Sequence, residues 1–122
     1  MKACPTGWHL PFKVEWEKLF LFADSTYAPG KLSNEGKYLK AKSGWDKQHD
    51  GKSGNGTDKF GFSALPGGYV GAGSFFYGVG NKGFWWSATD NLSFYLDIYN
   101  DKAYSGGGGG DNPFYSVRCI KD

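Results

Sequence analysis

Residues 83–100 read GFWWSATDNLSFYLDIYN, and they contain two predicted strands in succession. The runs 83–89 and 92–100 are rich in aromatic and other apolar residues, as is typical of strands. Alternation in the second run places two sets of side chains on opposite faces: Phe94, Leu96 and Ile98 against Tyr95, Asp97 and Tyr99. A third strand is predicted at 114–122, FYSVRCIKD, so we expect a small antiparallel sheet in the C-terminal half.

Two short helices are predicted before this sheet. Residues 13–24, KVEWEKLFLFAD, carry apolar side chains at helical spacing, namely Trp16, Leu19, Phe20 and Ala23. Charged residues lie on the other face of this segment. Pro11 precedes this segment, as is common near a helix start. A second helix is predicted at 34–42, and the glycine-rich segment 43–58 indicates a loop. The fold class is therefore α+β, with two short helices, a small antiparallel sheet and long irregular loops.

Composition sets further limits. A chain of 122 residues is long enough for one core, so we predict a single domain over 1–122. Its 20 glycines are accompanied by five Trp, eight Tyr and ten Phe, and this aromatic content indicates a folded, loop-rich protein. The net charge of +2, with mixed signs, argues against nucleic-acid binding. No apolar run has the length of a membrane span, so no membrane insertion is expected. The abrupt start, MKACPTGW, indicates a domain taken from a larger protein.

The sequence gives no support for catalysis, and we predict a protein that is not an enzyme and uses no cofactor. His9 lies between apolar residues in GWHLP and is interpreted as a packed or capping histidine. His49 lies in a charged loop and is interpreted as solvated. Glu15 and Glu17 are two positions apart, so they do not share a helix face as a pair of catalytic carboxylates would.

A calcium site in the loop 50–58 is the weaker of two interpretations of that segment. Asp50, Asn55 and Asp58 supply oxygen atoms of the kind that calcium prefers. Asp and Gly together mark ordinary turns far more often than metal sites, however, and the spacing is not that of an EF-hand. We therefore assign no metal ligands.

Cys4 and Cys119 lie near opposite ends of the chain. They are too few for a cysteine-rich zinc site. Two interpretations remain open from the residues alone. The first is that both cysteines are buried free thiols. The other is a disulfide, which would tie the termini together and contribute at most about 4 to 5 kcal/mol in the chain-entropy model. A disulfide would also indicate an oxidising compartment.

Four segments in register resemble the Fibrobacter succinogenes major paralogous domain. They are ACPTGWHLPFKVEWEKL at 3–19, GFSALPGGY at 61–69, GFWWSAT at 83–89 and SVRCIKD at 116–122. That family belongs to the formylglycine-generating-enzyme-like branch of the C-type lectin fold. The resemblance implies a C-type lectin-like fold in which the two terminal segments meet, which would place Cys4 and Cys119 close together and favours the disulfide.

The sequence also departs from the pattern of these relatives. Phe12 stands where the family usually has Ser or Thr, which predicts a lost helix N-cap, at a cost of about 1 kcal/mol. Neither cysteine matches a reactive position of formylglycine-generating enzymes, so their oxidase activity is not expected here. The Glu-Pro-Asn and Trp-Asn-Asp signatures of calcium-dependent lectins are absent, so calcium-dependent sugar binding is not expected either.

The same domain is similar to the variable proteins of diversity-generating retroelements. In those proteins a C-terminal segment ending near SVRC is diversified at template adenines and forms the ligand-binding face. The resemblance implies such a segment at about 86–118 here. An AAC codon for Asn becomes a Gly codon when both adenines change, which would account for Gly106–Gly110. A plain flexible loop and an engineered blanking of a variable loop are the two rival explanations of the glycine run.

We therefore predict a non-catalytic binding domain, with a protein as its ligand, in an extracellular or cell-surface position on a bacterium or phage. A calcium-independent carbohydrate-binding or adhesion module is the alternative. The predicted scaffold comprises Trp8, Trp16, Phe62, Leu65, Trp86, Val117 and the two cysteines. The predicted ligand-binding residues are Trp85, Asn91, Phe94, Tyr95, Leu96, Asp97, Tyr99, Tyr104, Ser105, Gly106, Gly108, Gly110, Asp111 and Asn112.

Overall fold

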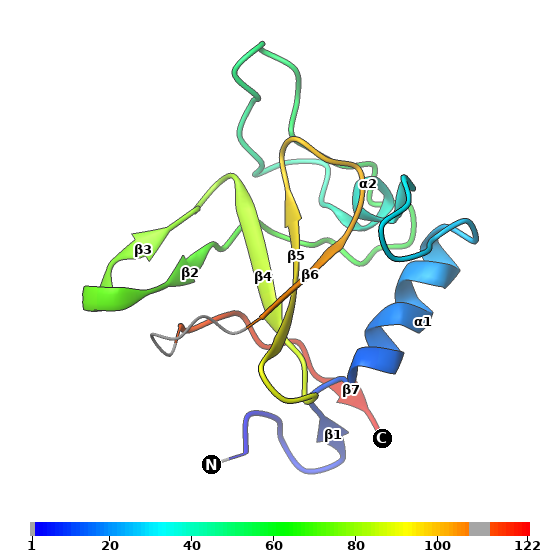
Figure 1. The fold of residues 1–122 in the computed structure, drawn as a ribbon, viewed down its shortest axis with the longest axis vertical. Coiled ribbons are helices and arrows are strands. Elements are labelled where there is room, and N and C mark those ends of the chain that lie inside the picture. Colours follow the sequence, from blue (N-terminus) through cyan, green and yellow to red (C-terminus); the bar gives the residue numbers. More distant parts are fainter. Residues whose placement is uncertain (1, 108–112) are drawn as a thin grey trace.

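The structure is a computed structural model that describes residues 2–107 and 113–122. The elements are β1 (Trp8–His9), α1 (Lys13–Ala23), α2 (Glu35–Leu39), β2 (Tyr69–Val70), the 3-10 turn η1 (Ala72–Ser74), β3 (Phe76–Tyr77), β4 (Lys82–Trp86), β5 (Leu92–Asp97), β6 (Tyr104–Gly107) and β7 (Ile120–Lys121). The described strands form three antiparallel sheets, β4–β5–β6, β2–β3 and β1–β7. The α+β class is confirmed. Figure 1 shows β4, β5 and β6 between α1 and the β2–β3 hairpin, with both chain ends at the same pole.

Helix α1 begins without an N-cap side chain, as the sequence predicts, but two other groups replace the cap. The Glu15 carboxylate accepts a hydrogen bond from the backbone N–H of Phe12 at 2.9 Å. Thr89, distant in sequence, accepts one from the N–H of Lys13 at 3.0 Å. Both donors belong to the helix start, where no intrahelical acceptor exists. The predicted loss of a cap is therefore offset by Glu15 within α1 and by a contact between α1 and the turn that joins β4 to β5.

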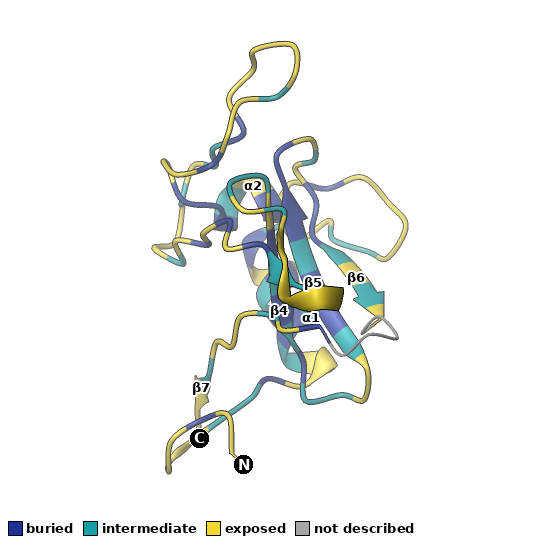
Figure 2. Ribbon diagram, turned by 90° about the vertical axis from the view of Figure 1, so that its left-hand side faces the viewer, coloured by how far each residue is buried: buried dark blue, intermediate teal, exposed yellow. Residues whose placement is uncertain are grey.

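The hydrophobic core lies between α1, α2 and the inner face of the β4–β5–β6 sheet. Trp16 is central, because its ring lies 5.7 Å from that of Phe94 and 6.4 Å from that of Trp85. Figure 2 shows that burial is concentrated on β4 and β5, while the peripheral loops are exposed. The buried cluster comprises Trp16, Phe20, Ala23, Leu39, Trp45, Ala64, Trp85, Phe94, Leu96, Ile98 and Ala103.

Buried charged side chains fix the connection between β5 and β6. Lys40 is almost fully buried, and its Nζ donates to the backbone carbonyls of Asp97 at 2.9 Å and Asn100 at 3.3 Å. Burial lowers the pKa of Lys40. Glu35 is fully buried, and its carboxylate accepts from the N–H of Ala103 at 2.8 Å and lies 3.7 Å from Lys102 Nζ. These contacts make the turn before β6 a rigid part of the scaffold.

Several predicted boundaries and burial assignments are corrected. The second helix ends at Leu39 rather than at residue 42. The predicted strand 114–122 is a strand only in β7, because the chain before it crosses between sheets: Phe114 pairs with Val70 and Ser116 with Trp85. Three predicted scaffold residues are exposed, and a fourth, Trp86, is only partly buried while its neighbour Trp85 occupies the core. The exposed three are Trp8, Leu65 and Val117.

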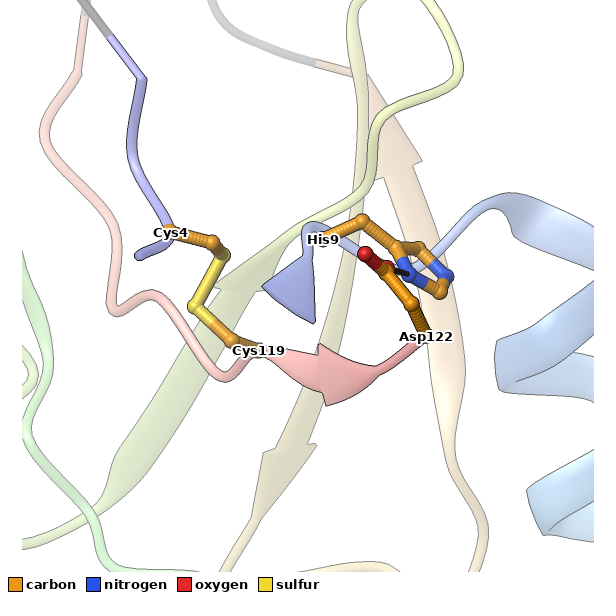
Figure 3. Close-up of a disulfide and its surroundings, with 4 residues drawn as sticks. All are labelled: Cys4, His9, Cys119 and Asp122. Carbon is orange, nitrogen blue, oxygen red and sulfur yellow. Dashed lines mark hydrogen bonds and ion pairs between the residues drawn. A yellow bond between two sulfur atoms is a disulfide. The ribbon is translucent and has the colours of Figure 1, made fainter. Parts of the chain in front are cut away.

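The terminal segments meet, as the resemblance implied. Cys4 and Cys119 form a disulfide with their Cα atoms 5.8 Å apart, and β1 pairs with β7 beside it (Figure 3). Next to this bridge the ring nitrogens of His9 form hydrogen bonds with the carboxylates of Asp122 at 2.6 Å and Glu15 at 2.9 Å. The disulfide interpretation is therefore confirmed over the free thiols. Neither helix in the described part of the chain has the length and hydropathy of a membrane span.

Candidate binding surface on the outer face of the sheet

Three aromatic rings lie in line across the outer face of the β4–β5–β6 sheet. The register pairs Phe84 with Tyr95 and Tyr95 with Tyr104. Their rings stack, with centroids 5.2 Å and 5.3 Å apart and interplanar angles of 30° and 19°. Since side chains alternate along a strand, these three point away from the core, opposite to Trp85 and Phe94.

Four more aromatic residues extend this line, one at the end of β4 and three from other segments. Tyr115 stacks on Phe84 at 5.1 Å and contacts Trp86 at 4.6 Å. Tyr69 packs edge-on against Phe84 at 5.1 Å and stacks on Tyr77 at 5.4 Å. All seven side chains keep part of their area exposed. We call this set the outer aromatic surface: Tyr69, Tyr77, Phe84, Trp86, Tyr95, Tyr104 and Tyr115.

The hydroxyls of Tyr95 and Tyr104 are neutral over the physiological pH range. Burial, with a smaller contribution from the Asp97 carboxylate, raises the pKa of Tyr95 and of Tyr104. Both hydroxyls therefore stay protonated and can donate hydrogen bonds. The Asp97 carboxylate is engaged within the protein, because it accepts from the backbone N–H groups of Tyr99 at 2.9 Å and Asn100 at 2.8 Å. The surface can offer apolar ring edges and hydroxyl donors, as protein-binding surfaces rich in tyrosine do.

Gly106 adjoins this surface in β6, Gly107 follows it on the alternate face of the strand, and both have room for larger side chains. Neither has the positive φ that would require glycine. A Cβ at Gly106 would come no closer than 3.6 Å, to the Ser93 hydroxyl, and would touch the Tyr95 ring at 3.8 Å. A Cβ at Gly107 would come no closer than 3.8 Å, to the carbonyl of Asn91. These are ordinary van der Waals distances, so the fold does not require glycine at either position.

Comparison with protein families identifies the chain. The family model described as the Fibrobacter succinogenes major domain matches residues 1–121. The chain belongs to this family. Comparisons with curated proteins and with solved structures found no match. The family resemblance drawn from the four sequence segments is therefore confirmed over the length of the chain.

In this Fibrobacter succinogenes major domain, the predicted ligand-binding residues fall into three groups. Four are buried and must be corrected: Trp85, Phe94, Leu96 and Asp97. Trp85 of β4 and the Phe94 and Leu96 side chains of β5 lie on the core face, and the Asp97 carboxylate accepts hydrogen bonds from the turn after β5. Six are exposed or partly exposed: Asn91, Tyr95, Tyr99, Tyr104, Ser105 and Gly106. Gly108, Gly110, Asp111 and Asn112 lie outside the described residues.

The exposed residues do not all join one surface. Tyr95 and Tyr104 belong to the outer aromatic surface, and Gly106 borders it. Tyr99 lies beyond the end of β5, where its ring stacks on His49 at 5.9 Å. Asn91 lies in the turn between β4 and β5 with a positive φ of 51°. The predicted segment therefore presents an ordered aromatic part and two peripheral positions.

Sequence reasoning missed five members of the outer aromatic surface. Phe84 and Trp86 share a parity in β4, so alternation puts them together, but alternation does not say which parity faces out. Tyr115 joins through the crossing segment that makes the Trp85–Ser116 bridge. Tyr69 and Tyr77 come from the β2–β3 hairpin, whose strands of two residues give too little periodicity to detect.

The loop 50–58 of this domain uses its oxygen atoms in separate turns. Asn55 accepts from the backbone N–H of Trp45 at 3.0 Å, and Asp50 accepts from that of Lys52 at 3.0 Å. Asp58 binds the hydroxyl and the N–H of Ser63, and these bonds lower its pKa. Within residues 2–107 and 113–122, no group of three His, Cys, Asp or Glu residues could hold a metal ion.

His9 lies between two carboxylates near the disulfide and the chain ends. Its two ring nitrogens each face a carboxylate, that of Glu15 and that of Asp122. The hydrogen bond with Glu15, followed by that with Asp122, raises the pKa of His9. The backbone bond from Phe12, followed by the bond with His9, lowers the pKa of Glu15. The expected packing and capping role fits this geometry, since Glu15 connects His9 to the start of α1.

Proposed function

We propose that this single domain is a non-catalytic binding module with a C-type lectin-like fold, and that its ligand is a protein. The outer aromatic surface and the adjoining part of β6 would make the contact. The segment at about 86–118 would be diversified in the manner of the variable proteins of diversity-generating retroelements. The domain would act outside the cell or on the surface of a bacterium or phage.

The observation that carries this proposal is the contrast among the glycines. At Gly56 a Cβ would lie 2.5 Å from the carbonyl of Lys37 and nearer still to that of Lys40, so the packing requires glycine there. Gly106 and Gly107 have no such constraint. Glycine is unfavourable inside a strand without a packing or conformational reason. Its presence at positions beside a tyrosine-rich surface is expected if those residues are selected for binding and not for stability.

The frame around the permissive positions also supports display of a varied segment. The turn that leads into β6 is anchored by side chains from outside the segment, namely those of Glu35 and Lys40. The N–H of Lys37 adds a bond to the carbonyl of Asp101 at 3.0 Å. After β6, the disulfide holds the chain at Cys119. Substitutions between these anchors can alter the surface without loosening the fold.

The stacking geometry favours a protein over a glycan. In carbohydrate sites the exposed face of an aromatic ring packs on the sugar. Here Phe84, Tyr95 and Tyr104 cover one another's faces, because their rings stack at 5.2 Å and 5.3 Å with small interplanar angles. Ring edges and hydroxyls are left for a ligand, and such groups contact the mixed surface of a protein well. Carbohydrate binding remains the alternative function.

Engaged side chains support a function without catalysis. His9 is held between two carboxylates, and both cysteines are joined in the disulfide. A general base must be free to reach a substrate proton, and a nucleophilic cysteine must be a thiolate. Neither condition is met by these residues.

The gene and its flanks provide the test. We expect an adenine-rich near-copy of the codons for residues 86–119 beside a reverse-transcriptase gene, with mismatches confined to adenines. The codons for Gly106 and Gly107 should then correspond to AAC or AAT in that copy. Flanks without such a copy would refute diversification and shift the assignment to a fixed binding or structural domain.

A further inference from the structure

The two edges of the β4–β5–β6 sheet differ. At the β4 edge the N–H of Trp86 donates to the carbonyl of Ser116 at 3.1 Å, and the N–H of Ser116 donates to the carbonyl of Phe84 at 3.0 Å. The C-terminal segment therefore closes that edge. Strand β6 lies at the other edge, and in the described part of the chain no further strand pairs with it (Figure 1).

The ladder geometry identifies the unpaired groups on β6. The carbonyl of Leu92 accepts a hydrogen bond from the N–H of Ser87, just after β4. In an antiparallel sheet the backbone N–H and C=O groups of Leu92 and every second residue after it therefore point towards β4, and those of the residues between them point towards β6. Carried through the register, this directs the N–H and C=O groups of Ser105 and Gly107 outward. Ala103, two residues earlier, likewise directs its N–H away from β5 and donates to Glu35. No hydrogen bond between described residues uses the outward groups of Ser105 and Gly107.

A cavity of about 170 Å³ opens along the same edge, between α1, the loop around residues 27–30 and the segment 102–105. Tyr27, Pro29 and Phe94 contribute apolar wall. Lys13 and Glu17 of α1 also line it and form an ion pair at 3.6 Å. Side chains of an added strand would alternate between this cavity and the outer aromatic surface beside Tyr104, because strand side chains alternate between faces.

We propose that the β6 edge binds an extended segment of a partner protein by strand addition, with one side chain of that segment entering the cavity. Strand addition rests on the proposed function, because it takes the ligand to be a protein, and it specifies how that protein would bind. A second copy of the domain fits less well, since its β6 offers Ser105 and two glycines, which would leave the cavity empty. The edge also lacks the lysine, proline or bulge by which strand edges are usually protected.

The test uses a phage-displayed library of random linear twelve-residue peptides, selected on the immobilised domain with its disulfide intact. Recovered peptides are synthesised and titrated calorimetrically against the wild type, Ser105→Pro and Ser105→Ala. Proline removes the outward N–H and leaves the bonds to β5 in place, whereas alanine keeps the N–H and removes only the hydroxyl. We expect Ser105→Pro to weaken binding at least about threefold, as loss of one hydrogen bond requires. Ser105→Ala should stay within about twofold of the wild type.

Amide hydrogen exchange on the wild type gives an independent result should Ser105→Pro not fold. In the free domain, the Ser105 and Gly107 amides should exchange fast while those of Tyr104 and Gly106 are protected. Peptide should protect the first pair. If that pair gains no protection, strand addition is overturned. If protection instead rises with domain concentration in the absence of peptide, the edge binds a second copy and the partner proposal is overturned.

A surface variant separates this proposal from the proposed function. Trp86→Ala removes a ring from the outer aromatic surface far from the β6 edge. Peptides weakened by Trp86→Ala but not by Ser105→Pro would overturn strand addition and leave the surface proposal standing. The reverse pattern would support strand addition and refute the surface as the contact. Recovery of no peptide above a blank support would count against both.

Discussion

Replacing Gly106 and Gly56 by alanine should have opposite effects on stability. Both glycines lie outside the left-handed region of φ, so the two variants differ mainly in the space around the new methyl group. At Gly106 the nearest atom would be 3.6 Å away, and the main effect is a smaller entropy of the unfolded chain. We expect Gly106→Ala to raise the free energy of unfolding by about 0.4 to 1 kcal/mol.

At Gly56 the methyl group would press on the backbone carbonyls of Lys37 and Lys40. Both carbonyls are held in place, because the Lys37 carbonyl accepts from the N–H of Thr57 at 2.9 Å and the Lys40 carbonyl accepts from that of Asp58 at 3.0 Å. Gly56→Ala should therefore cost about 1 to 3 kcal/mol, the usual range for overpacking. The two variants would then differ by about 1.4 to 4 kcal/mol, or on the order of 10 °C in melting temperature.

Urea unfolding followed by tryptophan fluorescence, with the disulfide intact, measures this difference. The slope of free energy against urea should be the same for both variants, which would show that the unfolded states are comparable. Gly106→Tyr is a stricter test, since a large side chain there should remain within about 0.5 kcal/mol of the wild type. A loss above 1 kcal/mol for Gly106→Ala would refute the inference that position 106 tolerates variation.

Three further predictions concern the scaffold. The pKa of His9 is raised, chiefly by Glu15, so its contribution to stability should be complete below about pH 6.5 and be lost as the pH rises through the pKa of His9 in the folded protein. Above that pH the melting temperatures of the wild type and His9→Gln should converge. Reducing the Cys4–Cys119 bridge should lower the free energy of unfolding by about 2 to 4 kcal/mol, measured by urea titration with and without dithiothreitol. Glu35→Ala should lower it by about 3 to 5 kcal/mol, because a buried lysine loses its counter-charge; an effect below 1 kcal/mol in the same titration would contradict that account.

Alternation in the sequence identified the members of each face of the sheet but not the direction in which each face points. Phe94 and Leu96 were correctly grouped together and Tyr95 was correctly placed on the opposite face, whereas Tyr99 lies beyond the end of β5. Nothing local distinguishes a buried aromatic residue from an exposed one. The decision depends on α1, whose Trp16 packs against Phe94. A contact between residues so far apart in sequence lies beyond any local pattern.

Helix α1 shows the opposite case. Its extent follows from spacing within the segment itself, and the observed bounds Lys13–Ala23 differ from the predicted 13–24 by one residue. The segment 114–122 failed as a strand because its hydrogen bonds go to two different sheets, through Phe114 and Ser116. The packing demand on each glycine was likewise hidden, since it depends on neighbours distant in sequence, such as the carbonyls of Lys37 and Lys40 beside Gly56.

The disulfide next to the paired terminal strands has a mechanical consequence. Cys4 and Cys119 lie at the same pole, so tension applied to the two ends of the chain passes through the covalent bridge (Figure 3). Strand β7 lies outside the bridge and its partner β1 lies inside it, so a load on the C-terminal side would act on the β1–β7 pair. The strands β2 to β6 lie between the cysteines and take no part in that pair, so the outer aromatic surface would keep its shape while the domain is pulled.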